Sequence, residues 1–261
     1  MVFEWVILVF IGLIVGSLIT MLSYRLPQVM EDDFGDQLKA LSVKRSSCPK
    51  CDAVLPWYRL IPVLSWVYSK GRCHACKEPI SVRYLLIELI AVAVTVLPFF
   101  LHGFSVNSVI LSVFMLWLFL VAVIDFEQFL ILDSLSLPLL WVGLLVNIAG
   151  YGWVSIESAV LGAVLGYVSL WAVFKLFKAI TGKEGLGYGD FKLLGAIGAW
   201  VGVMALPYVV LVGSVATLLY ALMLNLKTPL LGQQKIFPLG PGLALGGMVM
   251  ALFPSAFWIG V

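Results

Sequence analysis

Two aspartates are the residues of this chain whose type and setting best fit catalysis. Asp125 directly follows the apolar run Val-Ala-Val-Ile, and Asp190 ends the run Gly187-Tyr188-Gly189-Asp190, just before another apolar stretch. Two carboxylates that lie close together share a proton, because both do not easily ionise at short range. Such a pair can hydrolyse a peptide bond: one carboxylate takes a proton from water while the other protonates the carbonyl oxygen.

Four cysteines form two Cys-x-x-Cys pairs with metal-ligand spacing. The pairs are Cys48/Cys51 and Cys73/Cys76, separated by 21 residues, a gap just past the usual range for a two-knuckle zinc site. Four thiolates complete a tetrahedral shell around Zn²⁺ and leave no position for a catalytic water, so the expected site is structural. Disulfides are the competing interpretation, and a reducing cytoplasmic setting would disfavour them. His74 could replace one of the cysteines as a ligand, but it is expected to face solvent or to lie beside the ligands.

The elements that must position these residues are membrane-spanning helices. Of the 261 residues, 62% are hydrophobic and only 11% are charged, whereas about 25% are charged in soluble domains. This composition excludes a disordered chain and an ordinary soluble enzyme, and the net charge of +2 gives no argument for nucleic acid. The predicted fold is an all-α polytopic membrane protein of about eight transmembrane helices. The predicted spans are Trp5–Leu22, Leu85–Leu101, Ser108–Ile124, Leu135–Ala149, Ala159–Phe174, Phe191–Leu206, Tyr208–Leu226 and Leu239–Ile259.

The basic residues predict the orientation of these spans. When the eight spans are threaded alternately across the bilayer, all 16 Lys and Arg residues fall on one side, in residues 23–84, 175–192 and 227–235. The side rich in Lys and Arg is the cytoplasm. Both termini are therefore expected in the periplasm, with the cysteines, Asp125 and Asp190 on the cytoplasmic side. The first span could also be a cleaved signal peptide, but its basic flank follows the apolar run instead of preceding it.

The remaining acidic residues near the spans have structural interpretations. Glu88, one turn into the second span, is expected to snorkel or to pair with Arg83. Glu127 is read as charge at a helix end, and Asp133 as the cap of the fourth span. The acidic run Glu31–Asp36 is expected to be solvated, with contact to a basic partner as the alternative.

Glycines recur four residues apart in several spans. Small residues at this spacing let helix backbones approach closely in lipid, so each pair predicts a helix crossing. The pairs are Gly12/Gly16, Gly162/Gly166, Gly198/Gly202 and Gly242/Gly246.

These motifs together resemble the bacterial type IV prepilin peptidases, a family of GxGD-type membrane aspartyl proteases. The matching segments are Arg45–Cys51, Ile61–Trp66, Gly71–Cys76, Ile80–Tyr84, Ile124-Asp125, Lys183–Leu194 and Phe237–Pro241, with Gly16-Ser17 and Tyr24–Pro27 in and after the first span. The resemblance implies that the enzyme cleaves the basic leader from prepilins and pseudopilins at the cytoplasmic face of the bacterial inner membrane. It also implies N-methylation of the new terminus with S-adenosylmethionine as methyl donor.

Position by position, the resemblance implies that Asp125 and Asp190 are the catalytic pair and that the four cysteines are the ligands of a structural zinc ion. No motif assigns a residue to the methyl donor. The chain departs from the family pattern at three positions: Glu127 stands where Asp is frequent, Leu132 where Pro precedes the later Asp, and Leu239 where the last block has an aromatic residue. None of these departures touches the predicted pair.

The predicted domains are residues 1–22, the first helix; 23–84, a cytoplasmic zinc loop domain; and 85–261, the transmembrane peptidase domain. Two other functions remain open from the residues alone. A presenilin-like intramembrane protease also uses Gly-x-Gly-Asp, although this chain has Ile124-Asp125 where that class has Tyr-Asp. A proton-coupled transporter would use Asp125 and Asp190 as a proton relay.

Overall fold

The computed structural model describes residues 2–29, 46–48, 50–183, 185, 187–227 and 237–253. The chain divides into two compact units, residues 1–116 and 117–261, and each is described by itself below. The acidic run Glu31–Asp36 lies outside the described residues.

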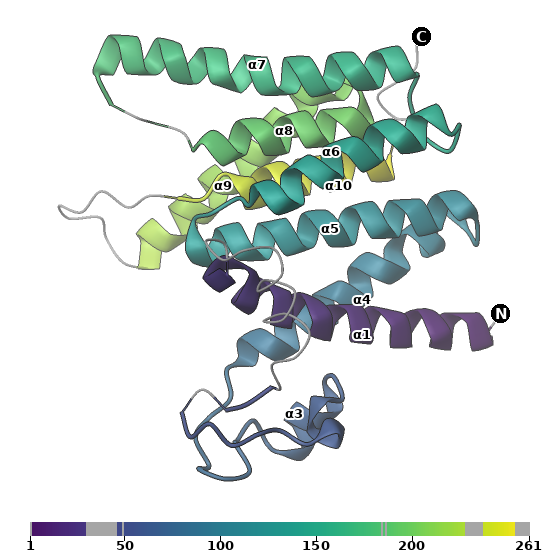
Figure 1. The fold of residues 1–261 in the computed structure, drawn as a ribbon, viewed down its shortest axis with the longest axis vertical. Coiled ribbons are helices and arrows are strands. Elements are labelled where there is room, and N and C mark those ends of the chain that lie inside the picture. Colours follow the sequence, from purple (N-terminus) through teal and green to yellow (C-terminus); the bar gives the residue numbers. More distant parts are fainter. Residues whose placement is uncertain are drawn as a thin grey trace. The chain divides into compact units, whose positions relative to one another are not determined.

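Helices make up most of the described part of both units, and each of the eight predicted spans overlaps one of them (Figure 1). Shorter elements lie between these helices: α3 at Leu64–Tyr68 and the 3₁₀ helices η1 at Leu26–Val29, η2 at Trp57–Leu60 and η3 at Val203–Ala205. The long helices are α1 Val2–Arg25, α4 Val82–His102, α5 Val106–Gln128, α6 Asp133–Ile148, α7 Ile156–Thr181, α8 Tyr188–Val201, α9 Leu206–Lys227 and α10 Gly240–Leu252.

Five segments of the described chain are long and apolar enough to cross a bilayer. They contain α1, α4, α5, α7 and α9. Helices α6, α8 and α10 are shorter than these five, with 16, 14 and 13 residues. A hydrocarbon core requires roughly 20. The all-helical, polytopic membrane class is therefore confirmed, while eight as the number of crossings stays a prediction.

The boundary between the sixth and seventh predicted spans was wrong. The sixth span was expected to reach Leu206, before Pro207, but α8 ends at Val201 and Gly202 turns the chain with a φ of 77°. Pro207 instead lies in the first turn of α9, where its missing N–H leaves no hydrogen bond unmade. Gly202, and not the proline, is the helix breaker here, because glycine adopts positive φ without steric cost.

In the first unit, α1 packs against α4 through the first predicted glycine pair. A Cβ atom on either Gly12 or Gly16 would lie 2.8 Å from a backbone Cα of α4, that of Val92 or of Glu88. Side-chain hydroxyls in these apolar helices bond to backbone carbonyls: Thr95 to Ala91 at 2.7 Å and Ser112 to Thr95 at 3.0 Å. The crossing that the glycines predict is thus present, and the buried hydroxyls of Thr95 and Ser112 have partners.

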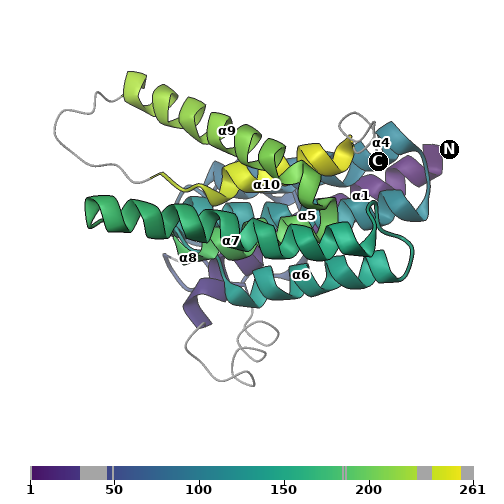
Figure 2. The same ribbon diagram turned by 90° about the horizontal axis from the view of Figure 1, so that it is seen from above.

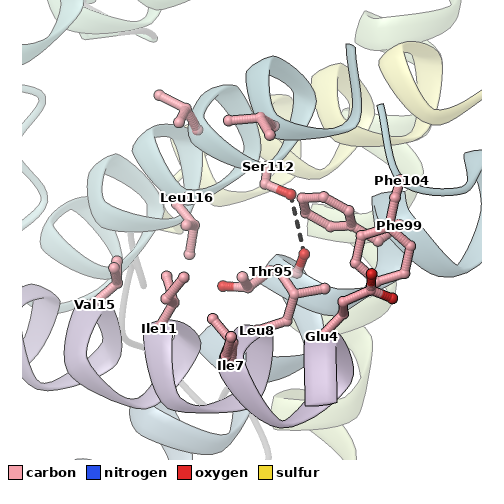
Figure 3. Close-up of a pocket in the computed structure, with 12 residues that line it drawn as sticks. Glu4, Ile7, Leu8, Ile11, Val15, Thr95, Phe99, Phe104, Ser112 and Leu116 are labelled. Atoms are coloured by element: carbon pink, nitrogen blue, oxygen red, sulfur yellow. Dashed lines mark hydrogen bonds between the residues drawn. The ribbon is translucent and has the colours of Figure 1, made fainter. Parts of the chain in front are cut away.

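A groove of about 390 Å³ opens between α1, α4 and the first half of α5. Figure 3 shows apolar side chains such as Ile11, Leu116 and Phe99 around it, with the Ser112–Thr95 hydrogen bond in its wall and Glu4 at one end. Because hydrocarbon side chains dominate this lining, the groove offers no acid–base pair for hydrolysis.

In the second unit, α8 is the buried helix around which the others pack, and every residue from Asp190 to Val201 except Lys192 is buried. Helices α6, α7 and α10 contact it, as the two ribbon views indicate (Figures 1 and 2). Asn147 of α6 donates to the Ala199 carbonyl at 3.0 Å, and Trp200 donates to the Leu139 carbonyl at 2.8 Å. These bonds fix the axial position of α8, and therefore the position of Asp190 at its start.

The remaining predicted glycine pairs lie at helix crossings of this second unit. A Cβ on Gly166 of α7 would lie 2.7 Å from the Leu194 carbonyl oxygen of α8. Gly162 faces Gly198 across the same crossing, and Gly242 faces Gly213 where α10 meets α9. The packing interpretation of these glycines is confirmed.

Candidate active site and metal site

Asp125 lies in the last turn of α5 and is buried, with 5% of its surface exposed. Its Oδ2 accepts a hydrogen bond of 3.0 Å from the backbone N–H of Gly240, the first residue of α10. The N-terminus of a helix carries unpaired N–H groups and a partial positive charge, and both stabilise a carboxylate. Asp125 is thus held by a helix that begins 115 residues later in the chain.

Asp190 is the third residue of α8 and is buried to a similar degree, with 8% exposed. Its Oδ2 accepts a 3.2 Å hydrogen bond from the N–H of Gly187, which caps the same helix. Gly240, which binds Asp125, and Gly189, which precedes Asp190, both approach Ile131, so the two carboxylates lie in one region of the second unit, the arrangement that the sequence predicts. Each buried carboxylate lies at the N-terminus of a helix, and the two helices differ.

Two glycines bring the backbone close to this pair. A Cβ on Gly240 would lie 2.5 Å from Oδ2 of Asp125, and a Cβ on Gly189 would lie 2.6 Å from Cβ of Ile131. Ile131 also approaches Gly240, at 3.0 Å from the same hypothetical Cβ, so the turn after α5 packs against the starts of both α8 and α10. The role of Gly240 was not predicted from the sequence, where its signal is the Gly-Pro pair in the last motif.

Aromatic rings support the start of α8. The Phe174 ring of α7 lies 5.2 Å from that of Tyr188 and 5.5 Å from that of Phe191, measured between centroids. Phe174 and Phe191 are fully buried. Because Tyr188 and Phe191 flank Asp190 in sequence, their packing against Phe174 restricts the positions that the first turn of α8 can take.

The prediction that Asp133 caps α6 is wrong. The N-cap position is Leu132, which has no side-chain capping bond, and Asp133 follows it in the first turn. Its carboxylate instead pairs with Lys192 of α8, whose Nζ lies 2.6 Å from Oδ2. Lys192 lies within reach because α6 and α8 pack against each other. Glu127 is half-buried in the last turn of α5.

The four cysteines of the first unit come together. The Sγ atoms of Cys48, Cys51, Cys73 and Cys76 all lie within 4.8 Å of one another, and those of Cys48 and Cys76 are 3.9 Å apart. Zn–S bonds of about 2.3 Å in a tetrahedron place sulfurs roughly 3.8 Å apart. All four are free thiols, and two are buried while two are exposed. The donor set and spacing fit a tetrahedral metal ion.

The two cysteine pairs repeat one local geometry. The N–H of the first cysteine donates to a carbonyl five residues later, Cys48 to Ala53 at 3.1 Å and Cys73 to Glu78 at 2.9 Å. The residue after the second cysteine has positive φ in both pairs, 53° at Asp52 and 61° at Lys77. Each sharp turn directs both thiols of its pair toward the same point.

At Cys73, backbone N–H groups favour the thiolate form, whereas the pKa of Cys76 is raised to about 11 by burial and by the neighbouring thiols. The N–H groups of Cys76 and Ala75 lower the pKa of Cys73 from 9.0 to about 6. A thiolate is the form in which cysteine ligates a metal. His74, between these residues, is exposed, as predicted.

Glu88 has the expected structural role, but its partner is Val63 and not Arg83. It is buried in α4, and its Oε2 accepts a 2.7 Å hydrogen bond from the N–H of Val63, in the segment between the cysteine pairs. Arg83, the anticipated partner, donates to the Ser23 hydroxyl at 2.7 Å.

Two family models match this chain in succession. The model described as the bacterial peptidase A24 N-terminal domain matches residues 10–102, and that of the type IV leader peptidase family matches residues 112–222. The first match contains all four cysteines, and the second contains both Asp125 and Asp190.

Curated relatives align along nearly the whole chain. A prepilin leader peptidase/N-methyltransferase of Aeromonas hydrophila is 39% identical over 263 residues, covering 93% of this chain and 88% of the relative. Proteins with the same name from Stutzerimonas stutzeri and Dichelobacter nodosus are 39% and 36% identical, with 93% of this chain covered and 88% and 89% of the relatives. No solved structure matches the chain.

Proposed function

The chain belongs to the type IV leader peptidase family, and from this membership we propose that it removes the basic leader from type IV prepilins and pseudopilins and N-methylates the new terminus. The observation that carries the proposal is the pair of buried carboxylates, Asp125 and Asp190, at the starts of α10 and α8. Its relatives bear the name of both activities.

The pair supplies general acid–base catalysis without a covalent intermediate. One carboxylate accepts a proton from the attacking water, and the other donates its proton to the oxygen of the scissile carbonyl. The burial of both groups favours a shared proton, because two neighbouring charges are costly away from water. The N–H groups of Gly240 and Gly187 each hold one Oδ2 and so orient the carboxylates for this exchange.

The cysteine cluster is assigned to a structural zinc ion held by Cys48, Cys51, Cys73 and Cys76. A shell of four thiolates has no open coordination position, so the ion would stabilise the segment and take no part in hydrolysis. The domain division proposed with it is residues 1–22 for the first helix, 23–84 for the zinc domain and 85–261 for the peptidase.

The proposed location is the bacterial inner membrane. The one-sided distribution of the 16 basic residues supports cytoplasmic placement of the zinc domain and of the aspartate pair, with both termini in the periplasm. S-adenosylmethionine is the proposed methyl donor, and no residue of the chain is assigned to it.

The test is an assay that follows leader loss and methylation separately. The purified protein in lipid vesicles is incubated with a prepilin and S-adenosylmethionine labelled on the methyl group, and products are followed by mass and by label. The expected result is loss of the leader mass and label on the shortened product. A full-length prepilin that remains uncleaved, with active relatives cleaving it in parallel, would refute the peptidase assignment.

A pre-cleaved pilin separates the two activities. The Asp125→Asn and Asp190→Asn variants are expected to leave prepilin uncut but to transfer label to pilin that already has a free N-terminus. Transfer by neither the variants nor the parent protein would remove the methyltransferase half of the proposal and leave the peptidase half standing.

A further inference from the structure

Helix α3 presents large apolar side chains away from the protein. Three of its five residues are strongly exposed: Leu64 at 63%, Val67 at 58% and Tyr68 at 86%. Trp66, on the same helix, turns inward, and its indole donates to the Ile80 carbonyl at 3.3 Å. The helix therefore has one packed side and one apolar exposed side, an arrangement that indicates an interaction surface.

This apolar surface continues onto the chain before α3. Tyr58 is 52% exposed and Ile61 is 39% exposed. We call Tyr58, Ile61, Leu64, Val67 and Tyr68 the α3 patch. All but Val67 line a pocket of about 270 Å³ together with Arg59 and Ser65.

Cationic groups border the α3 patch. The guanidinium of Arg59 lies 5.8 Å from the centroid of the Tyr58 ring, and its Nε is buried without a hydrogen-bond partner. Lys70 and Arg72 follow α3 and are exposed. Aromatic and aliphatic side chains flanked by Arg and Lys are typical of surfaces that lie at the membrane–water interface.

A hydrogen bond to α4 places the α3 patch near the level of the membrane surface. Val63, the residue before α3, donates to Glu88 at 2.7 Å. Glu88 comes six residues after Val82, the first residue of α4, which is about 9 Å along a helix axis. The 21 residues of α4 span about 31 Å, the thickness of the hydrocarbon core. The start of α3 is thus beside the first turns of α4, close to the level at which that helix enters the bilayer.

Glu88, which binds the N–H of Val63, lies where α4 packs closely against α1. The Cα of Glu88 is in contact with α1, because a Cβ on Gly16 would lie 2.8 Å from it. Val63 has a φ of 60° and a ψ of −55°, a strained conformation for a β-branched residue. A strained turn held by a buried carboxylate persists only where its surroundings fix it, so Glu88 sets the position of α3 relative to α4.

We propose that the α3 patch inserts into the headgroup layer of the phospholipid bilayer that α4 crosses, and that Glu88 holds it there. The apolar side chains enter the region between headgroups and acyl chains, and Arg59 and Lys70 pair with lipid phosphates. The cysteine segment, residues 48–76, is then held at the membrane surface by the α3 patch as well as by its chain connection to α4. This inference requires only that the chain spans a membrane, and it is independent of the reaction catalysed.

The test measures the surroundings of individual side chains of the full-length protein in nanodiscs of phosphatidylethanolamine and phosphatidylglycerol. A ketone-bearing amino acid at position 68 or 64 carries a nitroxide, which avoids labelling the four thiols. Collision with oxygen, which dissolves in lipid, is compared with collision with a water-soluble nickel chelate. Phe100 of α4, 72% exposed, provides the lipid reference, and Val54, 50% exposed in the cysteine segment, provides the matched apolar control.

Labels at Tyr68 and Leu64 are expected to collide more with oxygen than with the nickel chelate, as at Phe100, whereas Val54 shows the opposite. Nickel access at Tyr68 equal to that at Val54 would overturn the proposal. Shielding that appears only after prepilin is added would also overturn it, since the patch would then be a protein-binding surface.

The tether is tested with two substitutions at Glu88. Glu88→Gln keeps an oxygen acceptor for the Val63 N–H, and Glu88→Ala removes it. The lipid signal at Tyr68 is expected to persist in the glutamine variant and to fall toward the Val54 value in the alanine variant, with the Phe100 signal unchanged in both. An unchanged Tyr68 signal in Glu88→Ala would show that another contact holds α3.

Discussion

The aspartate pair and the cysteine cluster bring reactive side chains together in opposite ways. All four cysteines lie within residues 48–76, and two similar turns direct their thiols to one point. Asp125 and Asp190 are 65 residues apart, and their positions depend on three helices, α5, α8 and α10. A local motif can be recognised from spacing alone, whereas recognising a site assembled across helices requires knowing how those helices pack.

The first prediction concerns the loss of one carboxylate of the pair. Asp125→Asn or Asp190→Asn is expected to lower prepilin cleavage by about 10²- to 10⁴-fold, the usual range for general acid–base groups. The measurement is the rate of leader removal in vesicles. Glu157→Gln, an exposed acid in the first turn of α7, is the matched control and should retain the parent rate. Full activity in either aspartate variant would exclude the pair.

The second prediction concerns the backbone that holds Asp125. In Gly240→Ala the new methyl group would lie 2.5 Å from Oδ2 of Asp125, so the carboxylate must shift. A displacement of about 1 Å can cost on the order of 100-fold in rate. We therefore expect kcat to fall about 10- to 100-fold, with a smaller change in KM and with the pH profile altered, because the two ionisations belong to the pair.

Gly242→Ala serves as the control for this prediction. Gly242 faces Gly213 of α9 and does not approach Asp125, so its substitution should lower thermal stability while the folded fraction keeps its kcat. Equal losses of kcat in the Gly240 and Gly242 variants would mean that Gly240 acts only through helix packing.

These two sites also differ in how far the sequence predicted them. The cysteine spacing identified all four members of the cluster, since the turns that hold them are local. Threading brought Asp125 and Asp190 to one region, but nothing in residue type indicated that the Gly240 N–H would hold Asp125. That contact depends on where α10 begins, 115 residues away.

Errors in the prediction had similar origins. The sixth predicted span ends at Leu206, before Pro207, although proline is tolerated in a first turn and Gly202 supplies the break. Asp133 was taken as a cap, although Lys192 of another helix binds it. Helix existence followed from composition, while boundaries and polar partners depended on tertiary neighbours.

A third prediction tests whether the cysteine cluster is structural. The Cys48→Ser/Cys73→Ser variant is expected to lose its metal, from about one zinc ion per chain to almost none, as measured by metal analysis. Prepilin cleavage should fall less than in either aspartate variant. His74→Ala, which changes an exposed residue outside the four thiols, should keep its zinc. Equal zinc in the double variant and the parent protein would contradict the assignment.

The smallest expected effects come from one ion pair near each site. Lys192 and Asp133 approach to 2.6 Å with side chains 30% and 56% exposed, whereas Lys50 and Glu78 are 3.4 Å apart with side chains 68% and 47% exposed. Exposed ion pairs contribute about 0.2–1 kcal/mol, because water screens them and ordering the side chains costs entropy. Double-mutant cycles on thermal unfolding should therefore give a coupling near the upper end of that range for Lys192–Asp133 and near zero for Lys50–Glu78. A larger coupling for Lys50–Glu78 would mean that the two cysteine turns depend on each other's charges, and that the cluster is less local than its spacing suggests.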